Sequence, residues 1–200
     1  MFGHIGVEPC LVPVGQRINF QAAIFDLETG KPTILVLGGG TGSLALNRAF
    51  EQVADTVAAE FNVLHATGRG KGIFADRRAP AGYYVTELFV DDFGMALCLA
   101  DVVVTRAGVG TLLDLVREKK AAIFVPLPNS SQVANARAVE EAHAGIVLPE
   151  DRLEQDLVTM LREAIEPHRK QKLEERIGEL FPKDGAEKIV ELIRQKNTSG

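Results

Sequence analysis

Several absences in the sequence narrow the kinds of protein it can encode. Basic residues are not in excess, because 22 lysines and arginines stand against 27 aspartates and glutamates and give a formal net charge of -5. A chain without a broad basic surface is poorly suited to bind nucleic acid, whose phosphates are neutralised by lysine and arginine. The two cysteines lie far apart and form no CxxC pair, and the histidines are dispersed, so we predict no metal site.

Long hydrophobic runs are absent as well. No stretch approaches the ~18–20 apolar residues that a membrane-spanning helix requires. The first residues lack the basic and apolar regions of a signal peptide. We therefore predict a cytoplasmic protein.

What the chain contains is an alternation of short apolar runs with longer segments of helical period. Its 200 residues, 46% of them hydrophobic, are enough to bury one core of ordinary size. Continuously apolar strands that alternate with helices predict a doubly wound parallel α/β sheet, covered on both faces. We expect strands at 33–39, 61–67, 83–89, 101–106, 121–127 and 145–149, and helices at 43–60, 91–100, 110–119, 131–143 and 153–165.

The predicted domain organisation has three parts. Residues 1–30 show no clear period and are interpreted as a linker or a remnant of an N-terminal domain, residues 31–166 form the α/β domain, and residues 167–200 form a charged helical tail. The helix expected at 43–60 should place five apolar residues on one buried side: Leu44, Leu46, Phe50, Val53 and Val57. Asp91 and Asp92 precede a helical segment and are expected to cap it rather than bind a metal.

Three loops that follow strands could carry chemistry, since ligands of doubly wound sheets bind at the carboxyl ends of the strands. The first is "LGGGTGS" at 37–43, whose candidate ligand residues are Gly39, Gly40, Thr41, Gly42 and Ser43. Glycines permit close approach of a ligand, and the free amides at the start of the next helix suit an anion. The alternative is a tight turn without a ligand.

Two common nucleotide sites are disfavoured at this loop. A nicotinamide site is disfavoured because the second strand ends "LHATG", without an acidic residue for a ribose. A P-loop is disfavoured because no lysine followed by serine or threonine comes after the glycines.

The second and third loops also combine a strand end with a helix start. The second offers Arg106, Gly108, Val109, Gly110 and Thr111, with Asp114 one turn further on the same helical face, where a carboxylate suits a sugar diol. The third offers Ser131, Gln132 and Asn135, whose amides could recognise sugar hydroxyls. Ordinary helix capping, with Thr111 as one cap, is the alternative for both loops.

The segments "ILVLGGGTGSLALN", "FVDDFGMALCLADVVVTRAG" and "FVPLPNSSQVANA" resemble the C-terminal, donor-binding half of the MurG-type UDP-N-acetylglucosamine transferases, which form glycosyltransferase family 28 and have a GT-B fold. The resemblance covers residues 33–165. It implies an inverting reaction without an obligatory metal and without a cofactor, and it makes 31–166 a nucleotide-sugar-binding domain.

The resemblance also implies roles for individual residues. The stretch from Gly40 to Ser43 would line the diphosphate, and the stretch from Gly108 to Thr111 would cradle phosphate. Phe89 and Val90 fall where the family's backbone meets uracil. Further contacts would be Asp114 to the ribose, Ser131, Gln132 and Asn135 to the sugar, and Arg17, in a faint trace of an interdomain segment, to phosphate.

The sequence departs from the family at two of these positions and in length. The family usually has Glu at the position of Asp114, and His or Gln at that of Ser131, which puts the choice of sugar in doubt. The acceptor-binding N-terminal half is missing, and the catalytic base is expected there. The chain also resembles the donor subunit of a eukaryotic two-chain enzyme of this kind.

The function implied is the donor half of a glycosyltransferase that moves N-acetylglucosamine from UDP-N-acetylglucosamine to a polyprenyl-diphosphate-linked acceptor, as in peptidoglycan lipid II synthesis. Its partners would be a separate N-terminal acceptor-binding domain or subunit and the lipid-linked acceptor at the inner face of the membrane. Two alternatives remain open: a non-catalytic nucleotide-sugar-binding subunit, and a UDP-sugar hydrolase or epimerase of the same fold.

Overall fold

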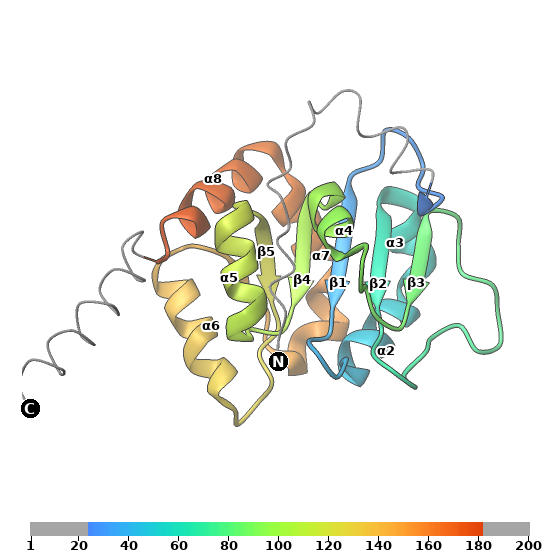
Figure 1. Ribbon diagram of the computed structural model, residues 1–200, viewed down its shortest axis with the longest axis horizontal. Helices are drawn as coiled ribbons and strands as arrows, with labels where there is room; N and C mark the ends of the chain where they lie inside the picture. The colour runs from blue at the N-terminus through green and yellow to red at the C-terminus, as the bar shows by residue number, and fades with distance from the viewer. Residues whose placement is uncertain (1–23, 182–200) are drawn as a thin grey trace, which may run out of the picture.

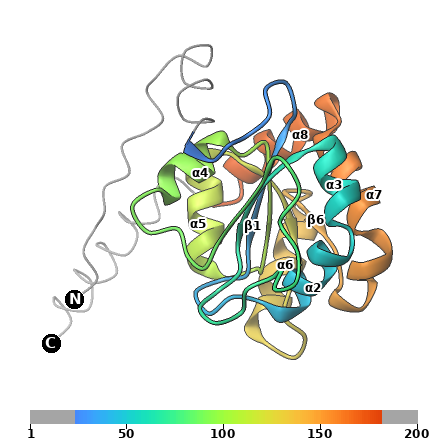
Figure 2. The same ribbon diagram turned by 90° about the vertical axis from the view of Figure 1, so that its right-hand side faces the viewer.

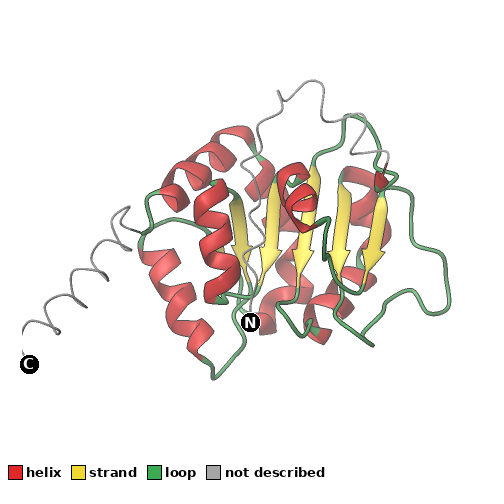
Figure 3. Cartoon of the chain, viewed as in Figure 1, coloured by secondary structure: helices red, strands yellow, loops and turns green. Residues whose placement is uncertain are grey.

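A computed structural model of the chain describes residues 24–181 and has a single parallel sheet at its centre (Figure 1). The strand order is β3-β2-β1-β4-β5-β6, and every neighbouring pair is parallel, so the strand arrows all run the same way (Figure 3). This confirms the predicted doubly wound sheet. The strands are β1 (Thr33–Leu37), β2 (Asn62–Ala66), β3 (Tyr83–Thr86), β4 (Val102–Thr105), β5 (Ala121–Phe124) and β6 (Ile146–Val147).

Helices cover both faces of the sheet because its central strands are apolar on both sides. Ile34 and Val36 belong to one buried cluster, whereas Leu35 belongs to the cluster on the opposite face. Figure 2 shows the sheet between its two helical layers. The first layer contains α2 (Leu44–Gln52), α3 (Ala54–Glu60) and α7 (Leu153–Ile165), and the second contains α4 (Phe93–Leu99), α5 (Val109–Glu118) and α6 (Ser131–Glu141).

The segment predicted as one helix at 43–60 consists of two helices. Val53, with φ -106° and ψ 11°, ends α2 and precedes α3. Leu46 and Phe50 are buried as expected, but Leu44 is 50% exposed. The Ser43 hydroxyl accepts a hydrogen bond from the Leu46 amide and so fixes the helix start, which leaves Leu44 on the first turn at the sheet edge.

The last described helix, α8 (Pro167–Gly178), packs against the rest of the domain after a short 3-10 turn, η1 (Glu150–Arg152), and α7. Leu173 and Ile177 are buried in the core. The Lys170 ammonium lies 3.1 Å from a carboxylate oxygen of Asp101, the residue before β4. The described part of the predicted tail is therefore held to the sheet by an apolar contact and an ion pair.

A buried polar network ties α2 to β2 and β3. The imidazole of His65 lies 2.8 Å from the Tyr83 hydroxyl and 3.1 Å from the Asn47 side-chain oxygen. Since the Asn47 nitrogen donates to the carbonyls of Thr67 and Lys71, its oxygen accepts from His65 Nε2, and His65 Nδ1 accepts from Tyr83. Burial lowers the pKa of His65 to about 3, so this neutral tautomer is the form the fold requires.

We expect the protein to lose stability as the pH falls between about 6.5 and 3 because His65 cannot take up a proton while it is buried. Its folded-state pKa lies below the unfolded-state value, so unfolding takes up a proton in that window. The contribution of His65 to this loss is about 2 kcal/mol between pH 7 and pH 5. Urea unfolding at both pH values measures it, and His65→Gln should show a smaller pH dependence. Equal pH dependence in the two proteins would contradict the assignment.

Candidate functional site

The candidate site lies at the edge of the sheet toward which all strands point. The chain moves outward from β1 through β2 to β3, and then returns to place β4 on the other side of β1. The loops after β1 and β4 therefore diverge at the switch point, where ligands of such sheets bind. In Figure 1 the starts of α2, α5 and α6 lie at this lower edge.

The glycines of the first loop serve two different purposes. Gly42 has φ +74°, and a Cβ on it would overlap the carbonyl oxygen of Thr67, so it is required by packing between loops. Gly39 and Gly40 are exposed, and a Cβ on either would meet nothing within 4 Å. The open side of the predicted phosphate loop is therefore at Gly39 and Gly40, beside exposed Thr41, whereas Ser43 is buried as the N-cap of α2.

The second loop presents backbone to the same edge. Gly108 is the N-cap of α5, so the alternative in which Thr111 caps the helix is wrong. The first backbone bond runs from the Leu112 amide to the Gly108 carbonyl, which leaves the amides of the first turn available to an anion. Val109 and Gly110 are exposed, and a Cβ on Gly110 would meet nothing.

Asp114 lies one turn further along α5. Its side chain is 32% exposed, and one carboxylate oxygen lies 3.3 Å from an Arg117 guanidinium nitrogen. This single, partly exposed ion pair leaves the carboxylate able to accept further hydrogen bonds.

The third loop uses its predicted sugar-recognising amides partly to hold itself in place. The Gln132 side-chain oxygen accepts from the Leu127 amide at 2.9 Å, and the Asn135 side-chain nitrogen donates to the Ala107 carbonyl at 2.8 Å. Ser131 is exposed at the start of α6, and Ser130 is the cap. Asn135 therefore joins the third loop to the second.

The two residues predicted to lie near uracil, Phe89 and Val90, differ in their exposure to solvent. The Phe89 ring is buried, with its centroid 6.1 Å from that of Phe25, so the ring is not available to a base. Val90 is 60% exposed. Asp92 occupies the N-cap position of α4, but its carboxylate accepts from the Val90 amide at 3.1 Å rather than from that helix. The expectation that the aspartates cap α4 through their side chains is therefore wrong for Asp92.

Arg106 lies beneath these loops rather than on their surface. Its guanidinium donates to the Ser43 hydroxyl at 2.6 Å and to the Val125 carbonyl at 3.1 Å. One of its nitrogens lies 2.5 Å from a carboxylate oxygen of Glu150, and the Arg106 side chain is 8% exposed. Arg106 was expected to contact the ligand, but the structure makes it the group that joins the ends of β1, β4 and β5 to η1.

Glu150 was missed by the sequence interpretation. It follows the short strand β6, where no glycine loop or capping motif draws attention to it. An acidic residue directly after "VLP", the end of the last apolar run, was the available signal. Its carboxylate neutralises the charge of Arg106 under the proposed ligand loops.

Some expected features fall outside this edge or outside the described residues. Arg17 is not among residues 24–181. Within that range, no three histidine, cysteine, aspartate or glutamate side chains are grouped so that they could hold a metal ion. The same part of the chain has no helix that is both long and apolar enough to cross a membrane.

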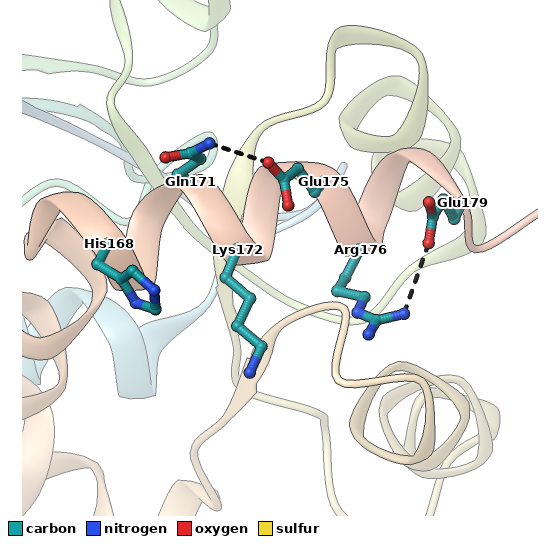
Figure 4. Close-up of a pocket in the computed structure, with 6 residues that line it drawn as sticks. All are labelled: His168, Gln171, Lys172, Glu175, Arg176 and Glu179. Carbon is teal, nitrogen blue, oxygen red and sulfur yellow. Dashed lines mark hydrogen bonds and ion pairs between the residues drawn. The ribbon is translucent and has the colours of Figure 1, made fainter.

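A pocket also lies against α8, away from the strand ends. Figure 4 shows its side chains paired along the helix, Gln171 with Glu175 and Arg176 with Glu179. No loop that follows a strand is among its described lining residues, which are His168, Gln171, Lys172, Glu175, Arg176 and Glu179. We therefore assign the site to the strand ends.

Comparison with known families agrees with the arrangement at this edge. The model of the glycosyltransferase family 28 C-terminal domain matches residues 33–192. The chain belongs to this family. Its match extends through α8, so the family's domain includes the described part of the tail.

Two curated relatives of this family 28 chain show how much of each protein is matched. It is 34% identical over 173 residues to a UDP-N-acetylglucosamine–N-acetylmuramyl-(pentapeptide) pyrophosphoryl-undecaprenol N-acetylglucosamine transferase of Clavibacter michiganensis, covering 84% of this chain and 46% of the relative. It is 32% identical over 158 residues to the enzyme of the same name from Geobacillus kaustophilus, covering 76% and 44%. The chain thus spans about half the length of the relatives it matches.

Solved structures support the fold. MurG of Acinetobacter baumannii superposes with a TM-score of 0.72 at 22% identity, covering 88% of this chain and 52% of MurG. A calicheamicin glycosyltransferase superposes with a TM-score of 0.66 at 19% identity, covering 88% and 46%. The domain therefore has the fold of the Rossmann-like half of a GT-B glycosyltransferase.

We predict that Glu150→Ala lowers the free energy of unfolding by ~3 kcal/mol because it leaves the Arg106 charge buried without its partner. Urea unfolding followed by circular dichroism measures the change. Glu140→Ala, at an exposed position of α6, is the matched control and should change stability by less than ~0.5 kcal/mol. If the two variants lose the same stability, the ion pair does not hold the loops together.

Proposed function

We propose that this chain is the donor-binding half of an inverting glycosyltransferase that transfers N-acetylglucosamine from UDP-N-acetylglucosamine to a polyprenyl-diphosphate-linked acceptor, as in lipid II synthesis. The observation that carries the proposal is the convergence of two open glycine loops, each at a helix start, at one edge of a family 28 domain. The names of the curated relatives support the choice of sugar and acceptor.

Different residues would contact the diphosphate, the ribose and the sugar of the donor. The exposed backbone of Gly39, Gly40 and Gly110, with the amides that begin α2 and α5, would bind the diphosphate through N–H groups and helix dipoles. The Asp114 carboxylate would accept hydrogen bonds from the ribose. The exposed Ser131 and the remaining polar atoms of Gln132 and Asn135 would contact the sugar.

In the proposed reaction, an acceptor hydroxyl attacks C1 of the sugar while the bond from C1 to the diphosphate oxygen breaks. The electron pair of that bond leaves with UDP, and the hydroxyl proton passes to a base. This chain would stabilise the charge that develops on the leaving diphosphate with donors already in place, which is usually a large contribution to catalysis. The base, the acceptor site and the contact with the membrane surface would come from a separate N-terminal domain or subunit at the cytoplasmic side.

The described residues fit a reaction in which no metal holds the diphosphate. The proposed anion site consists of backbone amides at helix starts, which can bind a diphosphate directly, and the charge of Arg106 beneath the loops is neutralised by Glu150. We therefore assign the leaving-group stabilisation to the protein's own donors, with no cofactor.

Isothermal titration calorimetry of the chain with UDP tests the donor site. We expect saturable binding of UDP, because the diphosphate and nucleoside contacts are both in this domain. NAD should not bind, since β2 ends at Ala66 and is followed by Thr67, with no acidic residue for the adenosine ribose. Binding of NAD without binding of UDP would overturn the proposal.

A sugar-transfer assay distinguishes the proposed function from two others, a non-catalytic binding subunit and a UDP-sugar hydrolase or epimerase. Labelled sugar should not reach a polyprenyl-diphosphate acceptor with this chain alone, and an added N-terminal half should restore transfer. A non-catalytic binding subunit would leave the rate unchanged in any combination. A UDP-sugar hydrolase or epimerase would convert UDP-N-acetylglucosamine without an acceptor.

We predict that Asp114→Asn weakens binding of UDP about tenfold, because a hydrogen bond to a charged group contributes roughly 1.5–3 kcal/mol. The 2′,3′-dideoxy analogue of UDP lacks the ribose hydroxyls and serves as the control ligand. Its affinity should be nearly the same for both proteins. Equal losses for UDP and the analogue would mean that Asp114 only supports α5.

A further inference from the structure

We propose that the ammonium group of Lys71 is a diphosphate-binding group of the donor site. The proposal rests on the proposed function and adds a cation from a fourth loop, between β2 and β3. Lys71 is half-buried, and its Nζ lies 2.7 Å from the carbonyl oxygen of Thr41 and 3.2 Å from that of Gly42. These two residues directly precede Ser43, the N-cap of α2, so the charge lies at the start of the helix that would hold the diphosphate.

The loop that carries Lys71 is held in this position by several contacts. The Lys71 carbonyl accepts from the Asn47 side chain at 2.8 Å, which links it to the buried His65 network. The Gly70 amide donates to the Glu87 carboxylate at 2.9 Å. Gly68, with φ +89°, lies so close to Gly42 that a Cβ on either glycine would overlap the backbone of the opposite loop. These contacts constrain the loop and so fix the position of the Lys71 backbone beside the first loop.

The charge balance at this edge distinguishes Lys71 from Arg106. Arg106 is paired with the Glu150 carboxylate, so its charge is already neutralised. Within residues 24–181 Lys71 forms no ion pair with a carboxylate, and its partners at the glycine loop are the neutral carbonyl oxygens of Thr41 and Gly42. It therefore retains a net positive charge next to a site proposed to hold a dianionic group.

The chemistry of lysine suits this role. An ammonium has three donors on a flexible four-carbon stem, and two of them are used by the carbonyls of Thr41 and Gly42. The third donor is left for a phosphate oxygen, and rotation can exchange a carbonyl for a second one. Charge-assisted hydrogen bonds to phosphate are roughly twice as strong as neutral ones. When the bond from C1 breaks, Lys71 would stabilise the negative charge that moves onto UDP.

The competing explanation is that Lys71 only bridges two loops. Lys71→Gln separates the two roles, because glutamine keeps a side-chain donor for a carbonyl but removes the charge. Lys71→Arg keeps the charge. Lys172→Met, which removes one lysine charge from an exposed position of α8, is the matched control for a general change in net charge.

The affinities of UDP and uridine for the four proteins, measured by calorimetry and NMR titration, test the proposal. We expect Lys71→Gln to weaken UDP about tenfold or more and uridine less than twofold, whereas Lys71→Arg and Lys172→Met stay within about threefold of the unmodified chain for both ligands. Raising the salt concentration should reduce UDP affinity less in Lys71→Gln than in the unmodified chain.

Other outcomes would overturn the proposal. Unchanged UDP affinity in Lys71→Gln, or an equal loss for UDP and uridine, would make Lys71 a bridge between loops and leave the proposed function standing. Absence of UDP binding by the unmodified chain would instead reject the proposed function together with this inference.

Discussion

The buried guanidinium of Arg106 is the interaction on which the geometry of the candidate site depends. It reaches the N-cap of α2, the residue after β5 and a carboxylate of η1, so strand ends that are separate in the sequence share one group. A buried charge is tolerated only when it is paired and hydrogen-bonded, which requires all three partners to stay in place. The open loops can therefore expose backbone amides to a ligand while the strand ends from which they start remain fixed.

Glycine supports this arrangement in two physically distinct ways. At Gly42 and Gly68 the backbones of two loops approach so closely that no side chain fits between them. At Gly40 and Gly110 there is space for a side chain, yet none is present, whereas Gly39 is also open but has a φ of +82° that itself favours glycine. The close approach of Gly42 and Gly68 brings Lys71 to the start of α2. The open glycine positions leave backbone amides near the starts of α2 and α5 accessible. The proposed diphosphate site would use both properties, and this chain combines them at its switch point.

The side chains near the strand ends suit the proposed binding of a leaving diphosphate better than they suit proton transfer. His65 is buried and held neutral, and Glu150 is occupied by Arg106. Asp114, the residue proposed to bind the ribose, already has Arg117 beside it. This distribution accords with the proposal that proton removal belongs to a separate half, and with a chain that spans about half the length of its relatives.

The sequence by itself determined the parallel α/β class, the order of its elements and the positions of three loops that follow strands, because apolar runs and glycine clusters are local signals. It could not determine that the segment at 43–60 breaks at Val53, since the break changes no apolar period. Only the tertiary structure decided which glycines are open, that Arg106 turns inward to Glu150, and that Lys71 reaches the first loop. These features join residues that are 29 to 63 positions apart or come from different strand ends, and such contacts arise from packing of the sheet rather than from any local pattern.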